Sequence, residues 1–237
     1  MNNRPPRFIV ANDDDEPEDD ALYPSHDDGM EGDASDDDED SSVAADDVDA
    51  LRAIARLAQL AGGIDWFGAC GQPLQRADIA LLNEYCAAIG VFDPQIDRPD
   101  GWQALSDIIR EPDWDAELWQ TEEQAMQALM ESLAERDVSE HDLLVALNHA
   151  GTRATEAVRE KLEGLMDAAG FADDDLLEAG IQAAMQATQQ AALVLAAQAL
   201  LGDALEADGQ HPFALKFRLF ERGHWPLGLV GGSYRIF

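Results

Sequence analysis

The sequence predicts a mainly α-helical protein, a multi-helix bundle with a small C-terminal antiparallel β-meander and a disordered acidic N-terminal tail. Three observations support this fold class. Residues 1–45 are rich in Asp and Glu, residues 46–209 place apolar side chains at helical spacing, and residues 210–237 alternate apolar and polar side chains. We therefore expect a tail, a helical body, and a meander packed on that body.

The charge of the chain follows the same division. Residues 1–45 contain 16 acidic and 2 basic residues, residues 46–209 contain 32 and 9, and residues 210–237 contain 1 and 4. The formal net charge of the 237 residues is -34. Such a field repels DNA, RNA and anionic lipid and attracts cationic proteins. The composition thus argues against nucleic-acid and membrane partners and favours a basic protein partner.

The tail has too little apolar surface to offset the entropy lost on ordering, because acidic runs such as Asp13–Glu16 and Asp36–Asp40 alternate with Ser, Gly and Pro. One short apolar segment, residues 6–11, is an exception. It is expected either to stay disordered with the rest of the tail or to add a short strand to a sheet edge.

Capping residues and glycines divide the first part of the body into helices. Asp46 or Asp47 caps a helix that ends at Gly62. A second helix is expected at 75–89, with Ile79 on its apolar side and Gly90 as its stop. Prolines on both sides leave room for a short helix at 101–109.

Four more helices are expected downstream. The first covers 113–135, and Thr121 with Gln124 forms a capping-box pattern that allows a restart within it. Ser139 caps a helix at 140–148, and Thr152 or Thr155 begins a separate helix that ends at Gly170. The last is a long helix that starts at the run Asp173–Asp175 and reaches residue 201.

The long helix has no charged residue between Ala179 and Gly202, but its glutamines make it too polar for a membrane span. Its second half is apolar on all sides and must be surrounded by protein. It is expected to be the central helix of the bundle or to be completed by a second subunit, so a homo-oligomer is possible.

The last 28 residues are expected to form three short antiparallel strands. The first strand covers 213–220, where apolar residues alternate, and the second covers 225–230, where Pro226 and Gly228 predict a bulge. Gly231 and Gly232 form a two-residue turn to a third strand at 233–237.

No catalytic, phosphate-binding or metal-ligand motif is present, so we expect neither an enzyme nor a cofactor. His141 and His149 lack the spacing of a helical metal pair. The acidic run at 173–175 is better explained as a helix cap than as a magnesium site. Cys70 and Cys86 show no ligand or disulfide spacing, which predicts a reducing, cytoplasmic setting.

Two groups of residues are candidates for partner binding. Four tryptophans in an aromatic-rich segment form either an aromatic groove or part of an irregular core: Trp66, Trp102, Trp114 and Trp119. Four basic residues form an expected patch for the acidic tail or for an acidic partner: Lys216, Arg218, Arg222 and Arg235.

The function that the sequence favours is an acidic, nonenzymatic binding protein that captures or neutralises a basic protein, as an immunity protein, antitoxin or chaperone does. The alternatives are an assembly protein that self-associates through residues 179–202 and an enzyme of unrecognised type. A further alternative assigns the acidity to a salt-rich solvent or to genome composition.

Overall fold

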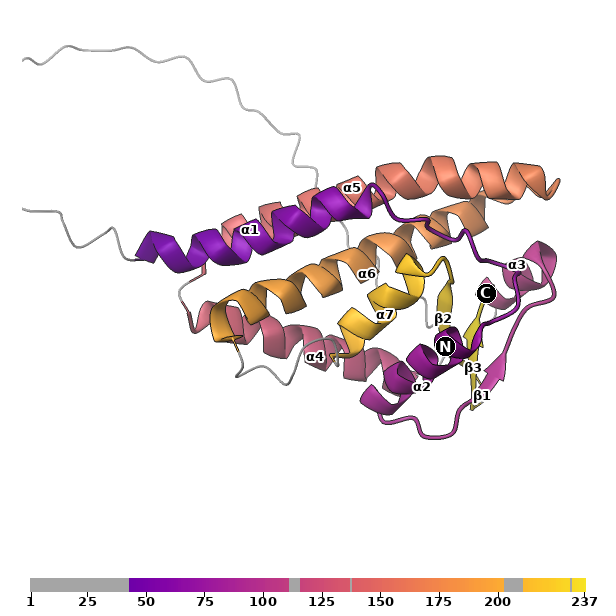
Figure 1. Cartoon of the computed structure of the whole chain (residues 1–237), viewed down its shortest axis with the longest axis horizontal. Coiled ribbons are helices and arrows are strands. Elements are labelled where there is room, and N and C mark those ends of the chain that lie inside the picture. Colours follow the sequence, from indigo (N-terminus) through magenta and orange to yellow (C-terminus); the bar gives the residue numbers. More distant parts are fainter. Residues whose placement is uncertain (1–42, 111–115, 137, 203–210, 231) are drawn as a thin grey trace, which may run out of the picture. The chain divides into compact units, whose positions relative to one another are not determined.

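Three helices form the main bundle (Figure 1). Helices α5 (Glu140–Ala168) and α6 (Asp174–Leu201) form an antiparallel hairpin, and α1 (Val43–Ala61) packs against both. The structure is a computed structural model that describes residues 43–110, 116–136, 138–202, 211–230 and 232–237. These residues belong to one compact unit, Asp40–Phe237.

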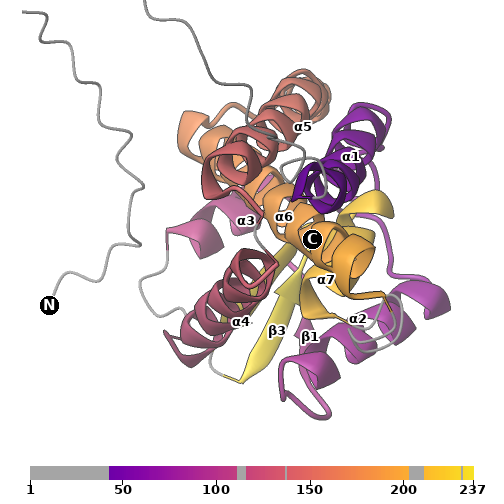
Figure 2. The same cartoon turned by 90° about the vertical axis from the view of Figure 1, so that its left-hand side faces the viewer.

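The smaller elements complete the fold, and their bounds are α2 (Arg76–Ala88), β1 (Gln95–Asp97), α3 (Trp102–Ile109), α4 (Ala116–Ala134), α7 (Pro212–Glu221), β2 (Pro226–Val230) and β3 (Ser233–Ile236). Helices α3, α4 and α7 pack on α6, and α2 packs on α7 (Figure 2). The predicted fold class, mainly helical with a small C-terminal sheet, is confirmed. The possible strand at 6–11 lies outside the described residues.

Helix α5 corrects one prediction, because it runs without a break where two helices were expected. Gly151 lies inside it and faces α6, where an added Cβ would lie 2.9 Å from Met185 Cγ and 3.0 Å from Gln189 Nε2. The glycine allows two helices to approach closely and does not end one. The predicted cap is correct, since Ser139 Oγ accepts a hydrogen bond from Asp142 N at 3.3 Å.

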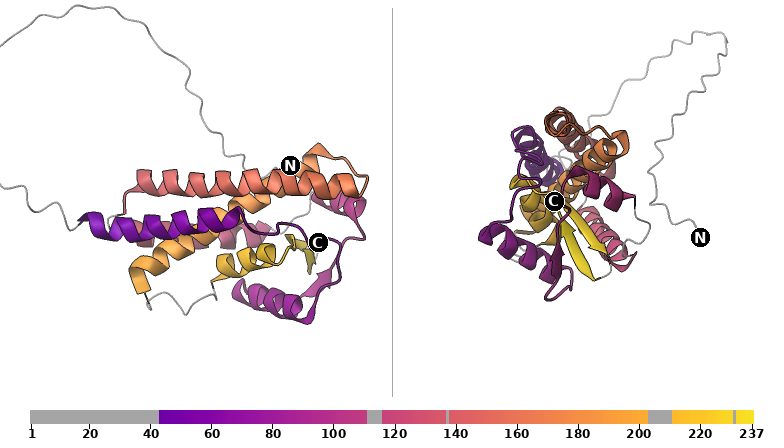
Figure 3. Two further views of the ribbon diagram at one scale, coloured as in Figure 1. Left: turned by 45° about the horizontal axis from the view of Figure 1, so that its top comes forward. Right: turned by 90° about the vertical axis from the view of Figure 1, so that its right-hand side faces the viewer.

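Helix α6 is the central helix of the bundle, as one of the two alternatives predicted. Helices α1, α3, α4, α5 and α7 all contact it. Leu193, Val194, Ala196 and Ala197 are buried, whereas Leu195 is 36% exposed. Most of its apolar second half is therefore buried by the chain's own helices, and Figure 3 shows the helix (orange) among the others in two further views.

Residues 213–220 were predicted to form a strand, and this was wrong, since they belong to helix α7. The apolar alternation arises from two helical faces. Phe213, Phe217 and Phe220 pack into the main core, while Leu215 and Leu219 pack into a smaller core with α2 and the sheet. Within each face, the buried side chains are three or four residues apart. Because the two faces are offset by two residues, buried side chains recur at every second position of the sequence, as they do in a strand.

The sheet has three strands, as predicted, but one of them comes from a different part of the chain. Its order is β1-β3-β2, with β1 parallel and β2 antiparallel to β3. Strand β1 comes from residues 95–97, which replace the strand expected before residue 221. The hairpin of β2 and β3 is confirmed, and so is its irregularity between Pro226 and Gly228.

Helix α2 matches its predicted bounds to within one residue, but its buried face is rotated about the helix axis relative to the predicted face. Leu81, Leu82 and Tyr85 are buried and Ile79 is 39% exposed. Asp78, which a hydrophobicity pattern places outside the core, is 3% exposed and lies on this buried face. The reason is a charged contact described below.

Candidate functional site

The structure describes the side chains of two of the four candidate tryptophans, Trp66 and Trp102. Trp66 is fully buried, donates from Nε1 to Ala61 O at 2.8 Å, and packs on Phe220 of α7. Trp102 is half-buried against Phe237, with ring centroids 5.2 Å apart. Trp66 therefore belongs to the core, as the second interpretation of the cluster predicted. Trp114 and the side chain of Trp119 lie outside the described residues.

Of the four candidate basic residues, Lys216 is held by a carboxylate of the same chain. Its Nζ lies 2.8 and 3.0 Å from the two carboxylate oxygens of Glu122 on α4. Tyr85 on α2 donates to Glu122 Oε1 at 3.1 Å. Side-chain exposure is only 14% for Lys216 and 12% for Glu122. This pair connects α4 with α7 and α2 at the edge of the smaller core.

Two more of the basic residues also have acidic partners. Arg222 Nε contacts Asp78 Oδ1, and Arg235 Nε lies 3.3 Å from Asp97 Oδ2. Arg218 is exposed, and its charge counteracts the rise that burial causes in the pKa of Glu221. The patch expected on the C-terminal segment is thus built largely into contacts within the fold.

Asp78 is the centre of a buried charged cluster. It caps α2 through Gln75 N, which donates to Asp78 Oδ2 at 2.7 Å, and His224 Nε2 lies 3.3 Å from the same oxygen. His224 is 2% exposed. Burial raises the pKa of Asp78, but the hydrogen bond from Arg222 and the contacts with Gln75 and His224 together lower it. The carboxylate therefore stays ionised at neutral pH.

The Asp78–His224 pair resembles part of a catalytic triad, but no nucleophile completes it among the described residues. The Cys70 thiol lies 3.7 Å from Gly223 O and 3.5 Å from Phe237 O, where it is a donor to carbonyl groups. Burial raises the pKa of Cys70 well above its usual range, which disfavours a thiolate. The arrangement is that of a structural thiol beside a structural charge cluster.

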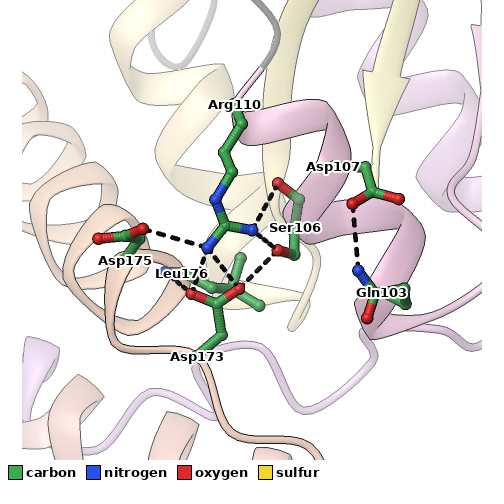
Figure 4. Close-up of polar contacts among 7 residues, drawn as sticks. All are labelled: Gln103, Ser106, Asp107, Arg110, Asp173, Asp175 and Leu176. Atoms are coloured by element: carbon green, nitrogen blue, oxygen red, sulfur yellow. Dashed lines mark hydrogen bonds and ion pairs between the residues drawn. The ribbon is translucent and has the colours of Figure 1, made fainter.

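A second charged cluster joins α3 to the start of α6 (Figure 4). Arg110 Nη2 lies 2.8 Å from both carboxylate oxygens of Asp173 and 3.1 Å from Asp175 Oδ2, while Ser106 Oγ donates to Asp173 Oδ2 at 2.5 Å. Asp173 Oδ1 also accepts from Leu176 N at 3.2 Å, which is a helix cap. The capping role predicted for the acidic run is confirmed.

The described residues contain no group of three His, Cys, Asp or Glu side chains placed to hold a metal ion. His141 and His149 are both exposed on α5. Within the same part of the chain, the helices include none whose length and apolar character suffice to cross a bilayer. Cys70 and Cys86 are both free, as predicted.

The structure uses most of its described basic side chains in contacts with its own carboxylates. Eight Lys and Arg residues lie within 4.0 Å of an Asp or Glu oxygen: Arg52, Arg110, Arg153, Arg159, Lys161, Lys216, Arg222 and Arg235. Because acidic residues greatly outnumber basic ones, many exposed carboxylates are left without a cation. The solvent-facing surface of the unit is therefore strongly negative.

Four of these exposed carboxylates form a line along α5. Glu156, Glu160, Glu163 and Asp167 are all exposed, and their spacing of four, three and four residues places them on the helix face opposite the core. We call these four residues the α5 carboxylate stripe. Sequence reasoning missed the stripe, although all four residues lie within the helix that was expected to end at Gly170 and their spacing is visible there.

Basic residues neutralise only part of the stripe. Arg153 pairs with Glu156 at 2.6 Å, and Arg159 lies 4.0 Å from Glu163. Glu160 and Asp167 have no basic partner in the described part of the chain. Asp167 also lies in the last turn of α5, which contains no basic residue, although the negative end of the helix dipole favours cations there.

Comparisons with known proteins identify no relative, because no family model, curated protein or solved structure matches the chain.

Proposed function

We propose that the protein is a nonenzymatic acidic module that captures a basic protein partner, and that the α5 carboxylate stripe is the centre of its binding surface. The observation that supports this proposal is an exposed line of four carboxylates, two of which, Glu160 and Asp167, have no basic partner among the described residues. Like charges three and four residues apart in a helix each cost about 0.2–0.5 kcal/mol. Folding therefore gives no reason for the unpaired half of the stripe, Glu160 and Asp167.

Partner binding gives a reason, because a line of carboxylates on a rigid helix matches a line of Lys or Arg side chains on another protein. Charge complementarity of this kind accelerates association and selects against acidic competitors. The position of Asp167 adds to the attraction, since the carbonyl groups at the end of α5 also favour cations. The partner we expect has a basic ridge or helix and not an isolated charge.

This role belongs to the class of immunity proteins, antitoxins and chaperones, which neutralise or escort a basic protein. We place the capture in a reducing compartment such as the cytoplasm, since two free thiols are kept in the fold. Self-association through residues 179–202 gains no support, because the chain's own helices cover this segment.

The proposal is tested by capture from a lysate of the native cells. The full chain is immobilised and exposed to lysate at about 0.05 M salt, and bound protein is eluted at about 0.5 M salt, where exposed charges are screened. We expect a basic protein that is retained at low salt and released at high salt. Recovery of no such protein would contradict the proposal.

A peptide of residues 1–42 is the control for general acidity, because it contains the 16 acidic residues of the tail but none of the stripe. The partner we propose binds the full chain and does not bind this peptide. If every captured protein binds the peptide equally, the surface of α5 has no special role.

A further inference from the structure

His224 has one partnered and one unpartnered ring nitrogen. Nε2 lies 3.3 Å from Asp78 Oδ2, while Nδ1 is buried and has no hydrogen-bond partner among the residues that the structure describes. A neutral imidazole with its proton on Nε2 suits this environment, since Nδ1 then carries no hydrogen. A second proton would have to occupy Nδ1, where no acceptor meets it.

Burial is the main obstacle to a second proton, and two of the charges around the ring add to it. Arg222, at the end of α7, contacts Asp78, and Arg98, which follows β1, lies near enough to influence His224. Asp78, the carboxylate beside the ring, acts in the opposite direction. Burial first, and the charges of Arg222 and Arg98 next, lower the pKa of His224, and Asp78 only partly offsets them.

The turn that contains His224 has little freedom to adjust. Gly223 has φ +81°, and its carbonyl oxygen accepts from Ala69 N at 2.9 Å. A Cβ at Gly223 would lie 2.6 Å from Ala69 N. The turn between α7 and β2 is therefore packed directly against the segment that precedes α2, and His224 and Arg222 join it to the first turn of α2 through Asp78.

We propose that His224 is an acid-sensitive latch: the neutral ring closes the α7–β2 turn onto the N-terminus of α2, and protonation at Nδ1 opens it. Opening loosens the smaller core, in which Leu82 and Tyr85 of α2 pack with Leu219 of α7 and Tyr234 of β3. The contacts of α5 with α1 and α6 do not involve this turn and stay closed.

The direction of the pH effect follows from the shifted pKa. A histidine whose pKa is lower in the folded chain contributes stability that is fully present above its ordinary value of 6.5. This contribution is lost as the pH falls below that value. Because one proton is involved, the open population rises by at most about tenfold per pH unit.

Hydrogen exchange of the full chain tests the latch at about pH 7.5 and about pH 5.5, with labelling times scaled for the intrinsic rate. In the wild type we expect faster exchange of residues 76–88 and 212–230 at the lower pH, with α5 unchanged. His224→Gln keeps a donor near Asp78 and cannot be protonated, so it should remove this difference. His141→Gln, at an exposed site on α5, should leave it intact.

Equal exchange of these segments at the two pH values in the wild type would overturn the proposal, and so would an unchanged response in His224→Gln. If His224→Gln does not fold, NMR titration of the wild-type ring protons decides. Faster exchange that follows the titration of His224 supports the latch, whereas faster exchange while His224 stays neutral contradicts it.

Discussion

Lys216 Nζ lies 2.8 Å from Glu122 Oε1, although 94 residues separate them along the chain. The contact joins α7 to α4, and Tyr85 of α2 adds a hydroxyl donor to the same carboxylate. Since both charged side chains are mostly buried, the pair fixes the positions of three helices and is unavailable to a partner. A residue expected to bind a partner is thus part of the framework.

Replacement of Lys216 by Met should destabilise the fold strongly, because Glu122 then stays mostly buried without its cation, with Tyr85 as its donor. Removing one partner of a buried ion pair costs about 3–5 kcal/mol of folding stability, and we expect a loss near the lower end of this range. Urea unfolding followed by tryptophan fluorescence measures it. Arg153→Ala, which breaks an exposed pair, is the control and should cost less than about 1 kcal/mol. An equal loss of stability in the two variants would show that burial of the Lys216–Glu122 pair does not contribute to stability.

Gly223→Ala should destabilise the protein by about 2–4 kcal/mol, because it combines an unfavourable backbone conformation with a steric clash at Ala69. Gly232→Ala is the matched control, since Gly232 has a similar φ of +85° but nothing within 4 Å of an added Cβ. It should cost only about 1 kcal/mol. Thermal unfolding of both variants gives the comparison. A cost for Gly223→Ala no greater than that for Gly232→Ala would exclude the close contact.

Asp173→Asn should destabilise the protein by about 1 kcal/mol at neutral pH, because the link to Arg110 loses its charge while Asn still caps α6. Burial raises the pKa of Asp173, but hydrogen bonds from Ser106 and Arg110 bring it below its ordinary value of 3.8. The stabilising contribution is present above that value and is lost as the pH falls through the folded pKa. The difference in Tm between wild type and variant should therefore shrink as the pH falls below 3.8. A constant difference would argue against the ion pair.

The sequence predicted the helical class, the bounds of α2 and α3, and the cap at Asp173, because these features depend on residues that are neighbours in the chain. It failed where a feature depends on distant contacts. The apolar pattern of α7 is a clear case: Leu215 and Phe217 are only two residues apart, and both are buried because they pack into two different cores. Pro212 at the first turn and Gly223 after the last turn were the local evidence for a helix.

The candidate site was less predictable than the fold for the same reason. Composition showed that carboxylates dominate the surface, but the partners of Lys216, Arg222 and Arg235 come from α4, α2 and β1. Only the folded arrangement shows that these cations are engaged. The spacing of the stripe was already visible in the helix expected to end at Gly170, but only the folded arrangement shows that Glu160 and Asp167 have no basic partner among the described residues.

Neutralising the unpaired part of the stripe should stabilise the protein. Glu160→Gln/Asp167→Asn removes like-charge repulsion and an unfavourable charge at the end of α5, a gain of about 0.5–1 kcal/mol. Glu84→Gln/Glu123→Gln removes the same two charges from exposed sites on α2 and α4 and is the control. Urea unfolding at low salt compares them. A loss of stability in the stripe variant alone would mean that these carboxylates serve the fold.

The most direct test of the central claim is the Kd of the captured basic protein for these two variants and for the wild type at about 0.05 M salt. Our account predicts that the stripe variant loses about tenfold in affinity while the control, with the same net charge, loses about twofold or less. An equal loss in both variants would contradict the account, because binding would then depend on total charge and not on the carboxylates of α5.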